Sequence, residues 1–568
     1  MPHPNYNRAV ETPRPLVPAP LARGGSAAVV APHHLATTAG LGILRAGGSA
    51  VDAAIATNAV LAVVFGEACG IGGDAFWLIW DEAASAQVAL NGSGRAPASA
   101  DPAALRARGL ATLPFRGPLT ITVPGAVRSW GDAHARFGRL PWADLLSPAI
   151  ELAGRGFPAD EPFARAVEGS AADFARELGD GGLGWAATYR PLGRPWQPGE
   201  RVCLPALAAT LERIAAAGAG DLYDGELAAR QAAGLAAAGS GITAADLAAH
   251  ASTWETPLSI AYRGATATTH PPNSSGLVGL EILNILRALE PPDRSTFVPG
   301  VDGATAGADL RWVHLGIEAT KRALADRDAH LSDPAFVDVP VGRLLDAAYG
   351  QALAGKIDPA RASTPPPSRA PRGGGTIWLG VVDPRGNAVS LVESNYAGFG
   401  SGIVDPATGI AYQNRGSYFS LEPDHPNVLA PGKRTLHTLL PGMLFRDGRP
   451  WVVHGSMGGD AQPAIFAQVI SALVDGGVDV ATAVAAPRWS PVPAAHFAPP
   501  DLVQVEPRFR PGLREGLAAM GHRLDVRAPF DGALGHAHAI ELVAGGPARG
   551  GTLAAATDPR SPGLAATW

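Results

Sequence analysis

The first two-thirds of the chain carries apolar residues mainly at helical spacing. Residues 36–46 predict an amphipathic helix that ends at Gly47-Gly48, a frequent stop signal. A second helix begins near Val51, and its run AAIATNAVLAVV is apolar nearly all round, which predicts burial on every side. Alanine-rich helical patterns fill residues 141–249, and a further helix is predicted over residues 310–325.

Short strand-like runs separated by turn signals are typical of the last third. These runs are TIWLGVVD, AVSLVESNY, GIAYQN and PWVVHGSMGG; AIFAQVISALVDGG predicts a helix among them, and one earlier strand is predicted over residues 76–80. Between the helical region and the strand-like region lie residues 358–375, DPARASTPPPSRAPRGGG, which we call the seam. Its five prolines and three terminal glycines can form neither a helix nor a central strand, so we predict an exposed, flexible segment.

The composition is that of a folded globular protein. The chain has 568 residues, of which 46% are hydrophobic and 17% charged, so disorder is not expected. The net charge of −6 argues against a large basic face, and nucleic acid is therefore not expected as a partner. The two cysteines, Cys69 and Cys203, cannot form a disulfide framework or a zinc ribbon, and we expect two reduced thiols.

Residues 1–25 predict a loose N-terminal arm. They lack the charged start and the apolar run of a secretory signal. No apolar stretch in the chain has the length of about 18 residues that a membrane span requires. These features predict a cytoplasmic protein without a membrane partner.

The junction of Gly375 and Thr376 allows two interpretations. The simpler one is a domain linker followed by a strand that begins with threonine, a residue that suits strands. The other is a self-cleavage site. A threonine hydroxyl needs a base beside it, and a chain that starts with threonine carries one in its free α-amino group, whose pKa lies near 8. Gly375 would leave its carbonyl open to attack by that hydroxyl.

The segment after the seam resembles the start of the small subunit in the gamma-glutamyltransferase family. TIWLGVVDPRGNAV is followed by FGSG, as in that family. Other stretches that match in order are GILRAGGSAVDAAIATNAVLAVV, GIGGDAF, TVPGAV, PPNSSG, KRALADRDAHLSDPAFVDVP, PGKRTLHTLLPGM, HGSMGGDAQ, APRW and DPRSPGLAA. Many ordered motifs are more specific than one, so the resemblance favours cleavage before Thr376, into pieces of 375 and 193 residues.

The resemblance implies a fold and a division of the chain. The fold is the four-layer αββα sandwich of N-terminal-nucleophile hydrolases, an α+β architecture. After the arm, residues 26–375 would form a helix-rich large subunit and residues 376–568 a small subunit. We expect the two pieces of the precursor to stay together, because neither could bury its sheet face alone.

The resemblance also implies catalytic roles. Thr376 would attack first the carbonyl of Gly375 and then the substrate, with its freed amine as general base. Ser394 stands where the family carries a hydroxyl that binds the nucleophile; a water-facing strand serine is the alternative. Gly458 and Gly459 match the pair whose N–H groups form the oxyanion hole, with a simple turn as the alternative. All these groups come from the chain, so we predict neither a metal nor an organic cofactor.

Several residues depart from the family where it holds the substrate. Ser93 stands at the position of the arginine that binds the α-carboxylate; Arg95, two residues later, either replaces that arginine or caps a loop. Tyr418 replaces the acidic residue that holds the α-amine, and Arg415, introduced nearby, would repel an ammonium group.

Two further departures flank the nucleophile and the acyl pocket. His437 and Thr438 replace the serine pair of the family, and Ile377-Trp378 replaces a threonine and a histidine. The pocket has therefore lost an anion suited to an amine and has kept or gained cationic donors. We predict a small-molecule amide whose acyl group bears a carboxylate without an adjacent α-amine, oxamate-like or glutaryl-like, with water as acceptor.

Three alternatives stay open. The chain could be an ordinary gamma-glutamyltransferase or glutathione hydrolase. It could be a homologue that cuts a carbon–carbon bond in an antibiotic pathway, or a non-catalytic homologue that is never processed, which the Ile377-Trp378 departure leaves open. Assembly into a higher oligomer is also left open.

Overall fold

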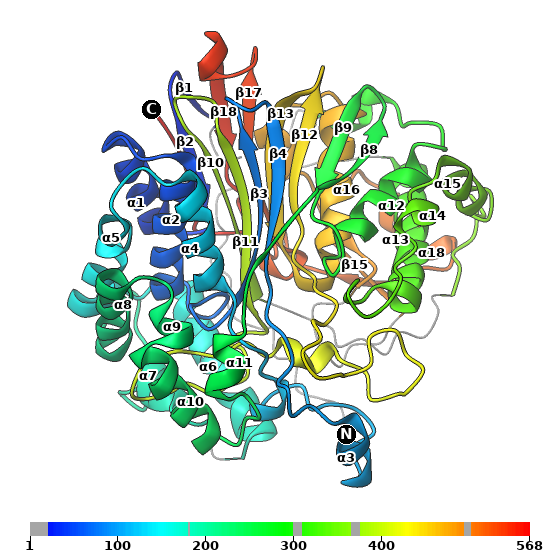
Figure 1. Ribbon diagram of the computed structural model, residues 1–568. Coiled ribbons are helices and arrows are strands. Elements are labelled where there is room, and N and C mark those ends of the chain that lie inside the picture. The colour runs from blue at the N-terminus through cyan, green and yellow to red at the C-terminus, as the bar shows by residue number, and fades with distance from the viewer. Residues whose placement is uncertain (1–20, 180–181, 299–308, 365–374, 493–500) are drawn as a thin grey trace.

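Two seven-stranded antiparallel sheets form the centre of the molecule (Figure 1). The computed structural model describes residues 21–179, 182–298, 309–364, 375–492 and 501–568. The strand order of the first sheet is β1 (Ala22–Gly24), β18 (Thr552–Ala556), β17 (His536–Val543), β13 (Arg449–Met457), β12 (Pro441–Arg446), β9 (Ala265–Thr269) and β8 (Leu258–Tyr262). That of the second is β19 (Leu564–Thr567), β2 (Ala28–Ala31), β10 (Gly375–Val382), β11 (Ala388–Tyr396), β3 (Asp74–Asp81), β4 (Ala86–Gly92) and β7 (Thr253–Glu255).

Helices cover the outer face of each sheet and complete four layers (Figure 1). Alternate residues of β10 explain the layering, because Leu379 and Val381 pack towards the helices whereas Trp378 and Val382 pack between the sheets. The second sheet is covered by α1 (His34–Arg45), α2 (Ala50–Val64) and α4 (Ala126–Phe137), and α5 (Trp142–Arg155) packs on α2. The first is covered by α12 (Gly276–Leu286) and α16 (Gln462–Val474), and α13 (Leu310–His330) packs on these two helices. The predicted αββα sandwich is confirmed.

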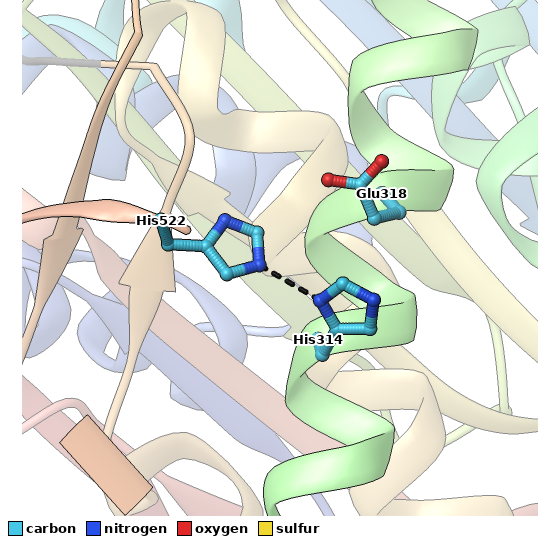
Figure 2. Close-up of side chains that lie close together, drawn as sticks. All are labelled: His314, Glu318 and His522. Carbon is cyan, nitrogen blue, oxygen red and sulfur yellow. Dashed lines mark hydrogen bonds between the residues drawn. The ribbon is translucent and has the colours of Figure 1, made fainter. Parts of the chain in front are cut away.

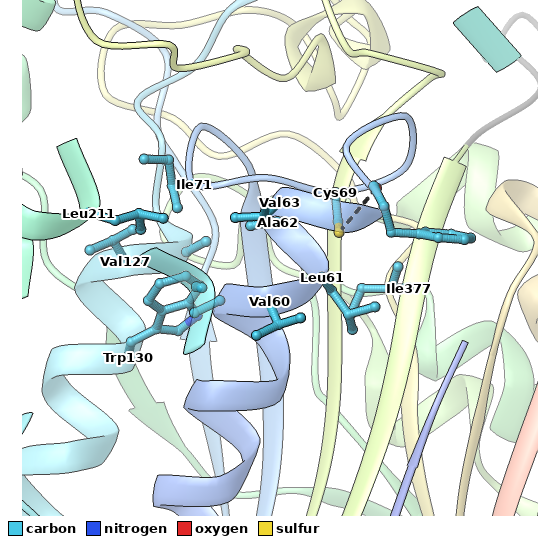
Figure 3. Packing of buried hydrophobic residues seen from close by; sticks show 14 of the residues in the cluster. Val60, Leu61, Ala62, Val63, Cys69, Ile71, Val127, Trp130, Leu211 and Ile377 are labelled. Carbon is cyan, nitrogen blue, oxygen red and sulfur yellow. Dashed lines mark hydrogen bonds between the residues drawn. The ribbon is translucent and has the colours of Figure 1, made fainter. Parts of the chain in front are cut away.

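The helix α2 is apolar all round because it is packed all round. Every one of its 15 residues is buried. Figure 3 shows Leu61 beside Ile377 of β10 on one side of the helix, and Trp130 of α4 on the other. Its polar Asn58 is satisfied, since the indole of Trp130 donates to it at 2.8 Å. The prediction of a fully buried helix is confirmed, and α2 packs against β10 on the outer, helix-covered face of the second sheet.

The remaining elements complete the helical layers and the edges of the fold. The other helices are α3 (Pro102–Ala107), α6 (Glu161–Glu177), α7 (Trp185–Tyr189), α8 (Pro205–Ala217), α9 (Asp221–Asp224), α10 (Glu226–Ala237), α11 (Ala244–Ala248), α14 (Val341–Leu344), α15 (Ala347–Ala354), α17 (Val480–Ala485) and α18 (Leu513–Ala519). The short strands are β5 (Phe157–Pro158), β6 (Arg201–Val202), β14 (Trp489–Ser490), β15 (Leu502–Val505) and β16 (Arg523–Val526). Across the described ranges, none of the helices is both long and apolar enough to span a membrane.

The structure corrects three expectations. The first two-thirds of the chain is not only helical, since it supplies three strands of the first sheet and four of the second. GIAYQN makes isolated bridges at Ala411 and Tyr412 instead of a strand, because its backbone bonds to separate loops. Ala22–Gly24 forms β1, so the loose arm does not extend to residue 25; the rest of the arm and seam residues 365–374 lie outside the described residues.

Candidate active site

Thr376 lies opposite a β-bulge at the start of β10. Gly375 pairs with Tyr396 and Ile377 pairs with Glu393, so two residues of β11, Ser394 and Asn395, face the single residue Thr376. A bulge redirects side chains at the end of a strand pair. Here it brings the Ser394 hydroxyl within 3.1 Å of the Thr376 hydroxyl, with both side chains buried.

The carbonyl oxygen of Gly375 is the centre of a small hydrogen-bond network. The Ser394 hydroxyl donates to it at 2.6 Å and itself accepts from the Tyr396 N–H at 2.7 Å. The Thr376 hydroxyl, which has a single hydrogen, lies 2.6 Å from the same carbonyl oxygen. The carbonyl that self-cleavage would attack is therefore polarised by a neighbouring donor.

Gly458 and Gly459 lie at the same end of the sandwich as Thr376. A Cβ added to Gly455 of β13 would collide with the ring of Trp378, near the start of β10. Farther along the strands, the hydroxyl of Ser390, which lies on β11 opposite Gly380 of β10, donates to the His454 carbonyl of β13. The two facing strands therefore bring the residues after Met457 towards the start of β10. Both glycines have positive φ, +150° and +53°, so side chains would be strained there. Within the described part of the chain, neither the Gly458 nor the Gly459 N–H donates to another backbone group, as an oxyanion hole would require.

Arg415 is a fully buried guanidinium with unused donors. It lies in a short 3₁₀ turn (η3, Arg415–Tyr418), and its Nη1 donates to the Thr438 hydroxyl at 3.1 Å. The ring centroids of Tyr396 and Tyr418 lie 4.4 and 5.5 Å from its Cζ. Its Nε and Nη2 have no hydrogen-bond partner, and no carboxylate among the described residues forms an ion pair with it. Burial lowers the pKa of this guanidinium from its ordinary value.

Tyr418 is held by a carboxylate next to the glycine turn. Its hydroxyl donates to Asp460 Oδ2 at 2.6 Å, and its ring lies 4.8 Å from that of Tyr396. The side chain predicted at the amine position therefore serves as a wall for Arg415 and as a link to residue 460.

His437 and Thr438 contact different partners. His437 Nε2 lies 3.1 Å from Asp74 Oδ2, whereas Thr438 accepts from Arg415. Burial raises the pKa of Asp74 to about 7, against the opposing effect of Arg415. Burial also lowers the pKa of His437, so the imidazole is neutral at ordinary pH.

Arg95 does not join this group of residues. Its guanidinium donates to the Gly432 carbonyl at 3.2 Å and lies 3.6 Å from Asp333, with about a third of the side chain exposed (31%). Ser93 is buried, and its hydroxyl donates to Asn91. Of the two interpretations of Arg95, these contacts fit the one in which the side chain caps a loop.

Sequence reasoning missed three residues of the site, namely Tyr396, Asp74 and Asp460. Tyr396 has a positive φ of 75°, which is unusual for an aromatic residue and places its ring against Arg415. The available signals were positional: Tyr396 is two residues after Ser394, Asp74 follows a glycine turn, and Asp460 follows the glycine pair.

A second polar cluster lies on α13. Figure 2 shows His314 and Glu318 one helical turn apart, with His522 bonded to His314 at 2.8 Å. Their ligand-type atoms lie within 4.8 Å of one another. However, Glu318 already accepts from Lys321 and Arg322, so a metal cation would meet two positive groups. The contacts fit a structural link between α13 and the loop after α18.

Comparison with known proteins agrees with this geometry. A family model described as gamma-glutamyltranspeptidase matches residues 36–568. The chain belongs to the gamma-glutamyltranspeptidase family. It is therefore a hydrolase of the N-terminal-nucleophile type, in the class of amidohydrolases and acylases.

Two curated relatives and one solved structure illustrate the family membership. Oxamate amidohydrolase proenzyme of Klebsiella pneumoniae is 40% identical over 547 residues, which cover 95% of this chain and 98% of that protein. Glutathione hydrolase-like YwrD proenzyme of Bacillus subtilis is 38% identical, over 94% of this chain and 97% of that protein. The crystal structure of cephalosporin acylase from Bacillus halodurans matches with a TM-score of 0.86 and 37% identity, over 98% of this chain and 99% of that one.

Proposed function

We propose that this protein is a self-processing amidohydrolase that removes a small, carboxylate-bearing acyl group from an amide through an acyl-enzyme on Thr376. The observation that carries the proposal is the unused side of Arg415. Its Nε and Nη2 are the pair of donors that point the same way, and neither has a partner among the residues that the structure describes, although the side chain is fully buried.

The same chain contains occupied examples of this donor pair. Arg190 binds Glu168 through Nε and Nη2 at 2.7 and 3.2 Å, and Arg213 binds Asp221 through the same atoms at 2.9 and 3.0 Å. A buried charge without a partner is costly. A substrate carboxylate that docked on Arg415 would supply both the charge and the geometry.

The proposed maturation begins with attack of the Thr376 hydroxyl on the carbonyl carbon of Gly375. The amide bond becomes an ester, and the Thr376 nitrogen becomes a free amine. Ser394, whose hydroxyl donates to the Gly375 carbonyl, supports this step by stabilising negative charge on that oxygen. Water then hydrolyses the ester and releases two pieces, residues 1–375 and 376–568.

The proposed turnover uses the new terminus. Its amine takes the hydroxyl proton as the oxygen attacks the substrate carbonyl, and the N–H groups of Gly458 and Gly459 stabilise the oxyanion. The amine then gives the proton to the leaving nitrogen, and water attacks the remaining acyl ester. An α-ammonium group on the acyl chain would be disfavoured beside Arg415, because Asp460, the carboxylate that contacts Tyr418, already binds Arg327 and Tyr418.

The relatives support this substrate class. One is named for oxamate, a molecule with a carboxylate next to the amide, and others are named acylases. Names of glutathione hydrolases also occur among the relatives, so the acyl group must be tested directly.

The test has two arms. Purified wild-type protein should give two bands near the sizes of 375 and 193 residues on a denaturing gel, whereas Thr376→Ala should stay at full length and be inactive. Thr376→Ser, which keeps a hydroxyl, is the matched control and should still process. In the second arm, ammonia release from oxamate and hydrolysis of glutaryl-anilide are compared with hydrolysis of gamma-glutamyl-anilide. A strong preference for the glutamyl compound would reject the substrate proposal.

A further inference from the structure

We infer that Tyr418, Asp460 and Arg327 form a bridge that holds the oxyanion turn in its working geometry, and that these three are positioning residues for hydrolysis. The inference rests on the proposed function, because it assigns a purpose to the Gly458-Gly459 turn in that reaction. It adds residues that neither touch the reacting atoms nor belong to the nucleophile network.

The contacts of the bridge converge on one carboxylate. Asp460 Oδ2 accepts from the Tyr418 hydroxyl at 2.6 Å, and Asp460 Oδ1 accepts from Arg327 Nη1 at 2.5 Å. The other side of Arg327 binds Asp328, with Nε 2.8 Å from Oδ1. Asp460 and Arg327 are almost completely buried, so these charge-assisted bonds are protected from solvent.

The position of Asp460 in the chain explains the effect on the turn. It directly follows Gly459 and is the middle residue of the 3₁₀ turn η4 (Gly459–Ala461). Two adjacent glycines are intrinsically free to rotate, and oxyanion donors must point at one spot. An anchored carboxylate at the next residue, together with the bond from the Ala461 N–H to the Gly458 carbonyl at 2.9 Å, removes that freedom.

The bridge also joins parts of the site that are separate in sequence. Arg327 comes from α13, before Thr376, whereas Asp460 and Tyr418 come after it. Tyr418 is at the same time a wall of the Arg415 pocket, with its ring centroid 5.5 Å from the guanidinium carbon. The bridge thereby connects the pocket for the acyl carboxylate with the donors for the acyl oxyanion.

The chain contains a matched triad away from the glycine turn. The Tyr262 hydroxyl donates to Asp475 Oδ2 at 2.8 Å, and Arg263 Nη1 donates to Asp475 Oδ1 at 2.7 Å. Its residues lie at the end of β8 and just after α16, and Asp475 is as buried as Asp460. Asp475 also accepts from the Ser471 hydroxyl at 2.7 Å. Loss of this carboxylate therefore removes the matching tyrosine and arginine bonds, and one more, without touching the oxyanion turn.

The experiment compares Asp460→Asn with Asp475→Asn. Both should be processed into two pieces, because the Gly375 carbonyl is contacted by Thr376 and Ser394 and not by either triad. For Asp460→Asn we expect kcat to fall about 10- to 100-fold with KM within about twofold, less than the loss of an oxyanion donor itself. Asp475→Asn should keep kcat within about twofold while its thermal midpoint falls.

Tyr418→Phe is the second variant, since it removes one hydrogen bond and leaves the ring in place. We expect its kcat to fall about 3- to 10-fold, the effect of one hydrogen bond of roughly 1 kcal/mol. Rates are measured on whichever anilide the wild type hydrolyses, so that an error in the proposed acyl group does not prevent the comparison. Equal kcat losses in Asp460→Asn and Asp475→Asn, a loss confined to KM, or an unchanged kcat in Tyr418→Phe would overturn the inference.

Discussion

Arg560 and Arg415 are both buried guanidinium groups, but their surroundings differ. Arg560 lies between Glu506 and Asp558, with Nε 2.6 Å from Glu506 and Nη1 2.9 Å from Asp558, and its Nη2 donates to the Ala486 carbonyl. The two carboxylates raise its pKa against the effect of burial. Arg415 has only a neutral hydroxyl on Nη1, and burial lowers its pKa.

The difference separates a structural charge from a binding charge. Around Arg560 the protein supplies every partner, and its two carboxylates each bind a second buried arginine as well, Arg508 at Glu506 and Arg488 at Asp558. Around Arg415 the protein supplies aromatic walls and leaves two donors unused. Because an unpaired buried charge costs free energy, we propose that a ligand completes the site around Arg415.

The largest expected effect is on stability at Arg560. Arg560→Gln should lower the free energy of unfolding by about 3–5 kcal/mol, because it removes buried charge-assisted bonds to Glu506 and Asp558 and two bonds to backbone carbonyls, although Arg508 and Arg488 still pair with the carboxylates. Denaturant titration of the purified protein measures this change. The partly exposed pair Arg190 and Glu168 offers the control, since Arg190→Gln should cost less than about 1 kcal/mol. If Arg560→Gln and Arg190→Gln lowered the free energy of unfolding by similar amounts, Arg560 could not be called a structural charge.

The next effect is on activity at Arg415. Arg415→Gln should lower kcat/KM for a carboxylate-bearing amide about 100- to 1000-fold, as expected when a buried charged hydrogen-bonded pair loses one partner. Its thermal midpoint should not fall, because no partner carboxylate is stranded. Steady-state kinetics and a thermal scan of the same sample give both values. A large loss of stability with unchanged kcat/KM would show that Arg415 resembles Arg560 after all.

The smallest effect concerns the pH dependence of carboxylate binding. Asp74, whose pKa burial raises to about 7, acts on Arg415 across the pocket. When the pH rises through 7, Asp74 loses its proton and becomes a competing anion, so the affinity for a carboxylate should fall about 3- to 10-fold. His437 stays neutral and Arg434, whose pKa burial lowers to about 10, stays charged over this range.

Inhibition constants of an unreactive dicarboxylate such as glutarate, measured from pH 6 to 8.5, test this expectation. Binding is measured instead of rate because the Thr376 amine would titrate in the same range. Asp74→Asn should abolish the dependence. A dependence of equal size in that variant would assign the titration to another group.

The sandwich and the proposed nucleophile could be predicted from the sequence because its ordered motifs resemble one family, whereas local patterns predicted single elements. The nearly all-apolar run of α2 and the continuous apolar run of β10 each indicated an element buried on all sides. Short strands such as β1 and β7, three residues each, carry too few positions to show a period.

The pairing of side chains in the pocket could not be predicted in the same way. His437 meets Asp74 across 363 positions, and Arg327 meets Asp460 across 133. Nothing in either local stretch indicates its partner. The sequence therefore pointed to Tyr418 and His437 as ligands for substrate, whereas in the structure they contact Asp460 and Asp74.

The place of Thr376 within the sheet has a consequence for the timing of catalysis. The strand that it opens runs between β2 and β11 and is already hydrogen-bonded along its length before any bond is broken. A break at residue 375 would thus create an amino terminus that is immobilised from its first moment, without a search through conformations. Maturation should then follow first-order kinetics, with a half-time that does not change when the precursor is diluted.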